Sequence, residues 1–217
     1  MAINSLSLNF SNPNIPKRQA GYTLIELSIS LAIIAVLLVG TLTGVQRLLR
    51  SNNTNNTVSQ TQAALTNITK LYASTGDATI TTTNTLRDLG VWEAAAVKVV
   101  GGLRTPQNPF GGNIVVGANA ALVGTAAAGS GYWYRLQGIP EEACASLATS
   151  FQNTATGIYV LNAPSTTTAT IGATPAAIKG FKKPGTPLNA PGDLATACTA
   201  NAATGAPLEI ALFVANN

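Results

Sequence analysis

An uninterrupted apolar run near the N-terminus constrains this chain more than any other feature. From Leu27 to Gln46 there is no charged side chain, and a lone carboxylate, Glu26, stands directly before the run. A helix of about 20 residues rises ~30 Å, which matches the hydrocarbon thickness of a bilayer. We therefore expect this run to form a helix that can span a membrane.

The residues before the run form a second pattern. A basic pair, Lys17 and Arg18, is followed by Gly21, and Glu26 comes five residues after that glycine. This arrangement resembles the signal of type IV prepilins, in which a membrane-embedded peptidase cuts after the glycine on the cytoplasmic face. The resemblance implies cleavage between Gly21 and Tyr22, methylation of the new amine of Tyr22, and a role for Glu26 in assembly.

The resemblance also divides the chain into three parts. It implies a removed leader at residues 1–21, an apolar half-helix at residues 22–50 and a globular head at residues 51–217. A leader of this length is typical of the type IVb subclass. At the first position of the mature chain, Tyr22 replaces the more usual Phe, Met or Leu. Two basic residues flank the apolar run on each side, so the positive-inside rule is tied. The expected orientation, with the leader in the cytoplasm and the head outside the inner membrane, follows from the resemblance.

Two other interpretations of the N-terminus stay open. A secretory signal peptide would be cut after the apolar run, but Thr41-Leu42-Thr43 is a poor small-x-small site. Glu26 could simply reach the headgroups, because a charge near the membrane edge costs less than the ~2.5–3.5 kcal/mol at its centre. After cleavage, however, the nearest cation would be the amine of Tyr22, in the same or a neighbouring subunit, and pairing the two charges favours the assembly role.

The composition indicates a surface suited to self-association. Charged residues make up only 9% of the chain, against ~25% in ordinary soluble domains, so little charge repulsion separates copies. The formal charge of +4 falls to +2 without Lys17 and Arg18. The one basic cluster, at Lys179, Lys182 and Lys183, has no neighbouring row of aromatic residues. We expect it to lie in a solvated loop, and we expect no sequence-specific nucleic-acid binding.

The residue types argue against an enzyme. The chain has no histidine, which removes the commonest general base and the commonest metal ligand. We find no metal-spaced cluster, phosphate-binding glycine loop or nucleophile–base pair, and therefore expect no catalytic, metal or cofactor-binding residues. Glu141 and Glu142 are adjacent, but they are better placed to cap a helix than to share acid–base chemistry.

The only two cysteines, Cys144 and Cys198, are expected to form a disulfide if the head is exported. Closing the loop between them would stabilise the fold by ~4 kcal/mol. Two separate buried thiols are the alternative, and the export signal argues against it.

The pattern beyond the apolar run predicts an α+β fold. The Asn- and Thr-rich residues 51–57 predict a weakened turn or kink. A helical stripe follows and should carry the long helix to about residue 74: Val58, Thr61, Leu65, Ile68 and Tyr72. Further helices are expected at 85–97 and 140–151, and strands at 113–116, 132–137, 158–162, 177–181 and 208–215. The prediction is a long N-terminal helix packed on a mainly antiparallel β-sheet, with a disulfide-bounded C-terminal region.

The second half of the chain also resembles the major pilins of the type IVb subclass, the toxin-coregulated pilin group in particular. The matching residues, in order, are Asn108-Pro109-Phe110, Gly138, Cys144 with Leu147 and Ser150, Cys198, and a closing strand at 208–214. The resemblance implies the type IV pilin fold and a major subunit of a surface filament used in adhesion, aggregation or conjugative DNA transfer. Its partners would be identical subunits, the prepilin peptidase and the pilus assembly machinery.

Two alternatives to a major pilin remain. A minor pilin, or a pseudopilin of a secretion machine, would share the same N-terminal signal. An uncleaved, monomeric, membrane-anchored binding domain would instead keep residues 1–21.

Overall fold

The computed structural model describes residues 22–75, 82–118, 131–161, 178–182, 191–199 and 207–215. The chain forms two compact units that meet in sequence between Val45 and Gln46. Helix α1 (Leu24–Thr75) contributes residues to both, and every other described element belongs to the second unit. The expected leader, and with it Gly21, lies outside the described residues.

The second half of α1 docks on the head through the predicted stripe. Thr61, Leu65 and Ile68 are buried, while Val58 and Tyr72 are partly buried against the same core. The helix ends at Thr75, as the periodicity predicts.

The kink expected at residues 51–57 is absent, because α1 runs through them without interruption. The hydroxyl groups of Thr54 and Thr57 donate to the carbonyls of Arg50 and Asn53, at 2.9 and 2.7 Å, inside the same helix. Thr57 is also fully buried. Docking against the head therefore outweighs the weak helix propensity of these residues, since most helical stability in proteins comes from tertiary packing.

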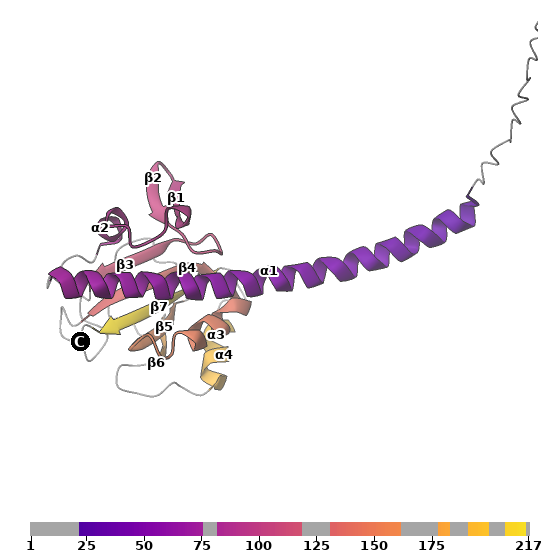
Figure 1. Cartoon of the computed structure of the whole chain (residues 1–217). Coiled ribbons are helices and arrows are strands. Elements are labelled where there is room, and N and C mark those ends of the chain that lie inside the picture. Colours follow the sequence, from indigo (N-terminus) through magenta and orange to yellow (C-terminus); the bar gives the residue numbers. More distant parts are fainter. Residues whose placement is uncertain are drawn as a thin grey trace, which may run out of the picture. The chain divides into compact units, whose positions relative to one another are not determined.

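The head is built on a five-stranded antiparallel sheet (Figure 1). The strand order is β3 (Ile114–Ala118), β4 (Gly131–Ile139), β7 (Leu208–Ala215), β5 (Gly157–Leu161) and β6 (Ile178–Lys182). Every neighbouring pair is antiparallel. All five strands fall within a few residues of their predicted positions, and the α+β prediction is confirmed.

One face of the sheet forms the main core. Alternate residues of the central strands point toward α1 and two shorter helices, α3 (Glu141–Ser150) and α4 (Pro191–Thr199). The largest fully buried side chains include Tyr132, Tyr134, Phe151 and Ile68. Because α1 supplies part of this core, the head and the second half of the helix form one packed structure.

Tyrosine and tryptophan put polar groups into this core. The Trp92 indole N–H donates to the hydroxyl of Tyr134 at 3.1 Å. Burial raises the pKa of Tyr134 and raises the pKa of Tyr132 to about 12, because the charged phenolate is disfavoured away from water. Both phenols therefore stay neutral throughout the physiological pH range.

The opposite face of the sheet carries a smaller apolar cluster and a buried ion pair. Arg135 on β4 donates through Nε to the Glu209 carboxylate on β7, and Gln137 Nε2 also donates to that carboxylate at 3.3 Å. Arg135 and Glu209 are almost completely buried. Removing either partner would leave an uncompensated buried charge, which is strongly destabilising.

The helix predicted at 85–97 is wrong in its extent. Helix α2 covers only Thr83–Asp88, with the Thr82 hydroxyl capping its first turn, and Gly90 follows with φ of +74°. A short 3₁₀ turn at Ala94–Ala96 leads into strand β1 (Val97–Val100), which pairs with β2 (Leu103–Pro106). The helical spacing that the sequence suggests is overridden because the chain turns at Gly90 and the following residues enter a hairpin.

The turn at residues 108–112 is held against β4 by close backbone contact. Asn108 donates through Nδ2 to the Gln137 carbonyl at 2.7 Å, and its Oδ1 accepts from the backbone N–H of Phe110. A Cβ added to Gly112 would lie 1.7 Å from the same Gln137 oxygen. Only glycine fits at this position.

Helix α3 begins after Pro140, as predicted, with Glu141 and Glu142 in its first turn. Glu142 also forms a 3.0 Å salt bridge with Arg50 of α1, which the sequence did not predict.

Within the basic cluster, Lys182 lies in β6 rather than in a loop. Its ammonium donates to the carbonyls of Gln152 and Ala155 after α3, at 2.6 and 2.8 Å. Lys183 is outside the described residues.

Candidate functional site

The described chain begins with a capped helix start. The Thr23 carbonyl accepts from Leu27 N–H at 3.1 Å, and its hydroxyl accepts from Glu26 N–H at 3.3 Å. Thr23 and Glu26 have the spacing of a capping box, which is a further sequence signal for the start of this helix. Glu26 also lies in the first turn of α1, where the helix dipole stabilises a carboxylate.

No described residue of the chain covers the first part of α1. From residue 22 to residue 50 every described side chain is exposed. The large apolar ones are Tyr22, Leu24, Ile25, Leu27, Ile29, Leu31, Ile33, Ile34, Val36, Leu37, Leu38, Val39, Leu42, Val45, Leu48 and Leu49. An apolar surface of this extent marks a membrane or protein contact. By length and composition alone, α1 is the one helix of the described residues that could cross a membrane.

Three hydroxyl groups in this stretch form hydrogen bonds within the helix. Ser28, Ser30 and Thr41 donate to the carbonyls of Ile25, Glu26 and Leu38, at 2.8, 2.8 and 3.0 Å. No water or partner is needed to pair these hydroxyl groups, which makes the stretch compatible with a hydrocarbon environment.

Gly40 and Gly44 lie on this helix four residues apart. A Cβ added to either would meet nothing within 4 Å. No side-chain crowding by the described residues therefore requires glycine here, and this spacing is one that allows two helices to approach closely.

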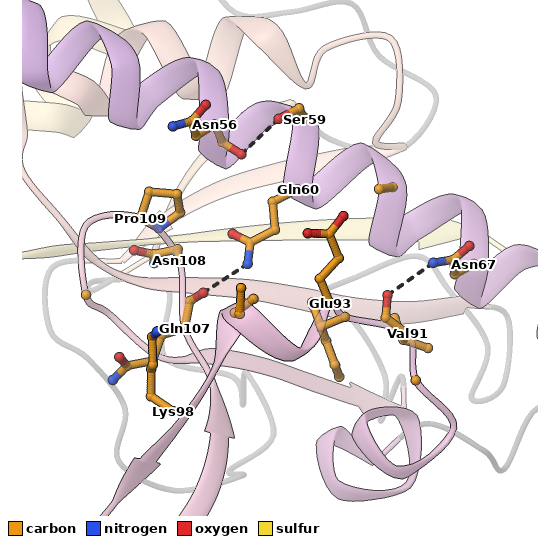
Figure 2. A pocket seen from close by; sticks show the side chains of 16 residues that line it. Asn56, Ser59, Gln60, Asn67, Val91, Glu93, Lys98, Gln107, Asn108 and Pro109 are labelled. Atoms are coloured by element: carbon orange, nitrogen blue, oxygen red, sulfur yellow. Dashed lines mark hydrogen bonds between the residues drawn. The ribbon is translucent and has the colours of Figure 1, made fainter.

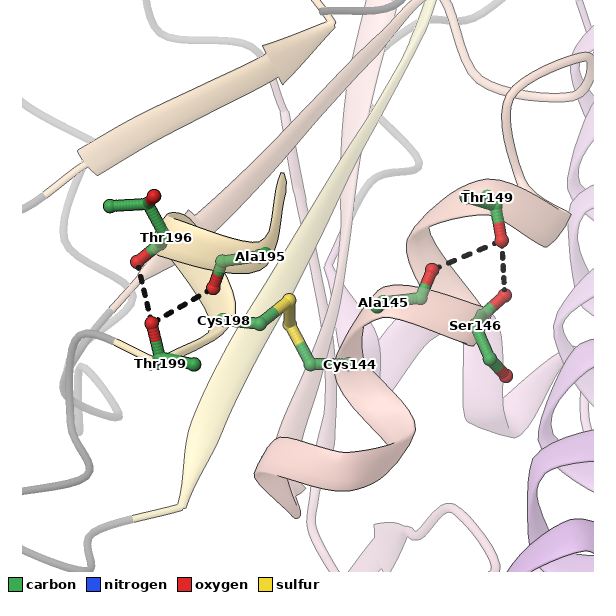
Figure 3. Close-up of a disulfide and its surroundings, with 8 residues drawn as sticks. All are labelled: Cys144, Ala145, Ser146, Thr149, Ala195, Thr196, Cys198 and Thr199. Carbon is green, nitrogen blue, oxygen red and sulfur yellow. Dashed lines mark hydrogen bonds between the residues drawn. A yellow bond between two sulfur atoms is a disulfide. The ribbon is translucent and has the colours of Figure 1, made fainter. Parts of the chain in front are cut away.

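The predicted cysteine pair is joined in the head. Cys144 of α3 and Cys198 of α4 form a disulfide with a Cα–Cα distance of 5.8 Å, and both residues are buried (Figure 3). The bond holds the two helices together across a sequence separation of 54 residues.

Comparison with known families assigns the chain. The prokaryotic N-terminal methylation motif matches residues 16–42, which include the expected cleavage site, Glu26 and most of the apolar run. The family described as PilS N terminal matches residues 51–206, well over half of the chain. The chain belongs to this PilS family. It is a type IV pilin that carries the N-terminal methylation motif.

Two solved pilin structures are similar to this pilin. One is a type IVb pilin from Salmonella typhi, with 20% identity, a TM-score of 0.48, and coverage of 75% of this chain and 99% of that chain. The other is TcpA, a type IV pilin from the El Tor biotype of Vibrio cholerae, with 19% identity, a TM-score of 0.49, and coverage of 76% and 99%. At these identities and scores neither carries an argument about function, so family membership rests on the PilS match. No curated protein matches the chain in sequence.

The pilin head also contains a groove that no sequence motif predicts. It lies between the second half of α1 and the segment from Gly90 to Gly111, and its volume is about 850 Å³ (Figure 2). Five of its lining residues carry side-chain amides: Asn56, Gln60, Asn67, Gln107 and Asn108. The sequence periodicity predicts that residues 90–97 are helical. The wall forms because these residues instead leave the helix after α2.

The predicted site residues thus fall into two separate groups. Tyr22 and Glu26 lie at the start of α1, and Cys144 and Cys198 lie in the head, in different compact units. Among the described residues, no three Cys, Asp or Glu side chains come together in a way that could hold a metal ion.

Proposed function

We propose that this chain is the major structural subunit of a type IVb pilus. In this proposal residues 1–21 are a leader that the prepilin peptidase removes after Gly21, and the amine of Tyr22 is then methylated. Residues 22–50 hold the precursor in the inner membrane, with the leader in the cytoplasm and residues 51–217 outside. The pilus assembly machinery then moves the subunit into an extracellular filament that serves adhesion, aggregation or conjugative DNA transfer.

The observation that carries the proposal is the uncovered apolar half of α1 with a carboxylate at its start. Glu26 is exposed, and so are the large apolar side chains that follow it. Lipid can cover this surface in the precursor, and the same helix of other copies can cover it in a filament. Pairing Glu26 with the amine of a neighbouring Tyr22 would avoid burying either charge alone.

A structural subunit, rather than an enzyme, is the role that fits the family. Pilins work by packing against copies of themselves, and a chain with 9% charged residues has little repulsion to oppose that packing. A minor pilin or a pseudopilin would share the N-terminal chemistry, and abundance in the fibre separates those roles from a major subunit.

The test is an intact-mass measurement with N-terminal sequencing on filaments sheared from the native host. We expect a chain that begins at Tyr22 with one added methyl group and is the dominant protein of the filament. The same chain as a trace component would instead indicate a minor pilin. A chain that begins at Met1, or that is cut after the apolar run, would contradict the proposal and leave an anchored or secreted binding domain.

A further inference from the structure

The groove in the head has the size of a small-ligand site. Its volume of about 850 Å³ lies within the ~300–1,000 Å³ usual for such sites. One wall is the exposed side of α1 and the other is the segment that includes the 3₁₀ turn and the start of β1 (Figure 2). All of these elements belong to the head unit, so the groove is formed before any assembly.

Four of the five side-chain amides each donate one hydrogen bond to another part of the head. The side-chain NH₂ group of Gln60 donates to the Gln107 carbonyl at 3.0 Å, and that of Asn67 donates to the Val91 carbonyl at 3.1 Å (Figure 2). The NH₂ group of Gln107 donates to Asn113 Oδ1 at 3.3 Å. The NH₂ group of Asn108 donates to the Gln137 carbonyl of β4. These bonds hold the walls in place, and because each NH₂ group carries two hydrogens, the amides can offer donors as well as oxygens to a ligand.

One of these oxygens has no donor. Gln60 Oε1 is buried, and no hydrogen bond reaches it from the described residues. A buried amide oxygen without a partner is unusual, since the large majority of buried polar side-chain atoms are paired. Because this atom is shielded from solvent, a donor from a bound molecule would reach it only after the Gln60 side chain shifts.

The charges of the groove cancel. Among its lining residues, Glu93 is the only acid and Lys98 the only base, and both are exposed on the wall opposite α1 (Figure 2). An anion would therefore meet Glu93 and a cation would meet Lys98. The remaining surface is largely apolar, with small residues such as Ala63, Ala95 and Ala96.

We propose that this groove binds a neutral saccharide. A sugar brings hydroxyl groups that both donate and accept to walls whose side-chain amides can do the same, and its C–H faces can lie on the small apolar residues. The proposal goes beyond the structural role and does not depend on filament formation.

The test compares two substitutions on exposed positions of the same helix. Ala63→Phe places a ring in the groove, whereas Ala73→Phe adds the same ring to α1 outside it. Sheared filaments of the native and variant pilins are applied to immobilised maltotriose, lactose and chitotriose, and to an extended Ser/Thr/Ala peptide. If a variant yields no filaments, the same measurement is made on the full-length subunit in detergent.

We expect native pilin to bind at least one of the three sugars, Ala73→Phe to bind it equally, and Ala63→Phe to bind it more than about ten-fold more weakly, since the ring removes volume needed by the ligand. Absence of sugar binding to native pilin, or equal binding by Ala63→Phe, would overturn the proposal. Binding of the peptide alone, if sensitive to Ala63→Phe, would make the groove a polypeptide site and would also overturn it. None of these results bears on cleavage at Gly21, so the two proposals fail independently.

Discussion

The two halves of α1 share one regular backbone and have opposite surroundings. Before Gln46, every described side chain of the helix is exposed, including a nearly continuous series of large apolar residues. After it, Ala64, Leu65 and Ile68 are buried in the core of the head. The head covers the second half, whereas no described residue covers the first, which in the proposed function is covered by lipid or by other copies. Changes in the first half should therefore alter insertion and assembly, and changes in the second should alter folding.

The largest effect is expected from a substitution in the first half of the helix, at Glu26. Glu26→Ala should leave processing and head stability unchanged but lower the yield of sheared filaments more than about ten-fold, because a neighbouring amine loses its counter-charge. Yield, intact mass and urea unfolding are measured on the same preparation. Ser28→Ala, two residues along the same exposed surface, is the matched control. Native yields of Glu26→Ala filaments would show that this carboxylate has no role in assembly.

The next largest effect is expected from the disulfide. Replacing both Cys144 and Cys198 with serine should lower the free energy of unfolding by ~4 kcal/mol, the entropy cost of the loop released in the unfolded chain. Urea titration followed by tryptophan fluorescence measures it, because Trp92 and Trp133 are both buried in the head. Ser146→Ala, on the exposed side of α3, should change little. A loss below about 1 kcal/mol would mean that the paired helices are held by packing alone.

A direct comparison of the two halves comes from truncating one apolar side chain in each. Ile68→Ala should cost about 2–5 kcal/mol, because Ile68 is fully buried and its removal leaves a cavity. Val36→Ala should change the unfolding of the head by less than about 0.5 kcal/mol, because Val36 is 74% exposed. If both substitutions lower the unfolding free energy of detergent-solubilised full-length protein equally, the two halves do not differ in their contribution to folding.

Alkaline pH should lower the stability of the head. The pKa of Tyr132 is raised from 10.0 to about 12 in the folded protein, so its contribution to stability is complete below pH 10 and is lost as pH rises toward 12. The unfolding free energy of the head should therefore fall over that interval, and Tyr132→Phe should make the fall shallower. An unchanged slope in this variant would contradict the assignment. Tyr134, whose pKa is also raised by burial, should account for part of the remaining slope.

The smallest effect is expected where α1 meets α3. The Arg50–Glu142 salt bridge joins two half-exposed side chains, and a double-mutant cycle should give a coupling of about 0.2–1 kcal/mol. The coupling should decrease with added salt, because solvent screens exposed charges. A coupling that salt does not change would indicate a contact less accessible to solvent than the exposed fractions suggest.

Several features of the fold were predictable because they depend on local or periodic signals. The stripe from Val58 to Tyr72 placed the second half of α1, and Pro140 with two following glutamates placed α3. The β1–β2 hairpin was missed although Gly101-Gly102 between apolar residues is a hairpin signal, and α4 was missed although Pro191 suits a first helical position.

Other features had no local signal. The pairing of Gln60 with Gln107, of Arg50 with Glu142 and of Trp92 with Tyr134 joins residues that only the folded head brings together. The same is true of the groove, whose walls come from α1 and from a segment beginning more than 20 residues after its last lining residue in that helix.

The sequence by itself determined that the chain has an apolar helix with a processing motif at its start, because both features depend on residues adjacent in the chain. It also determined the antiparallel sheet and the cysteine pair in outline. Only the tertiary structure decided that residues 51–57 stay helical and that residues 90–97 leave the helix. In each case contacts between distant residues outweigh a local preference of a few tenths of a kcal/mol per residue, roughly the spread of helix propensities.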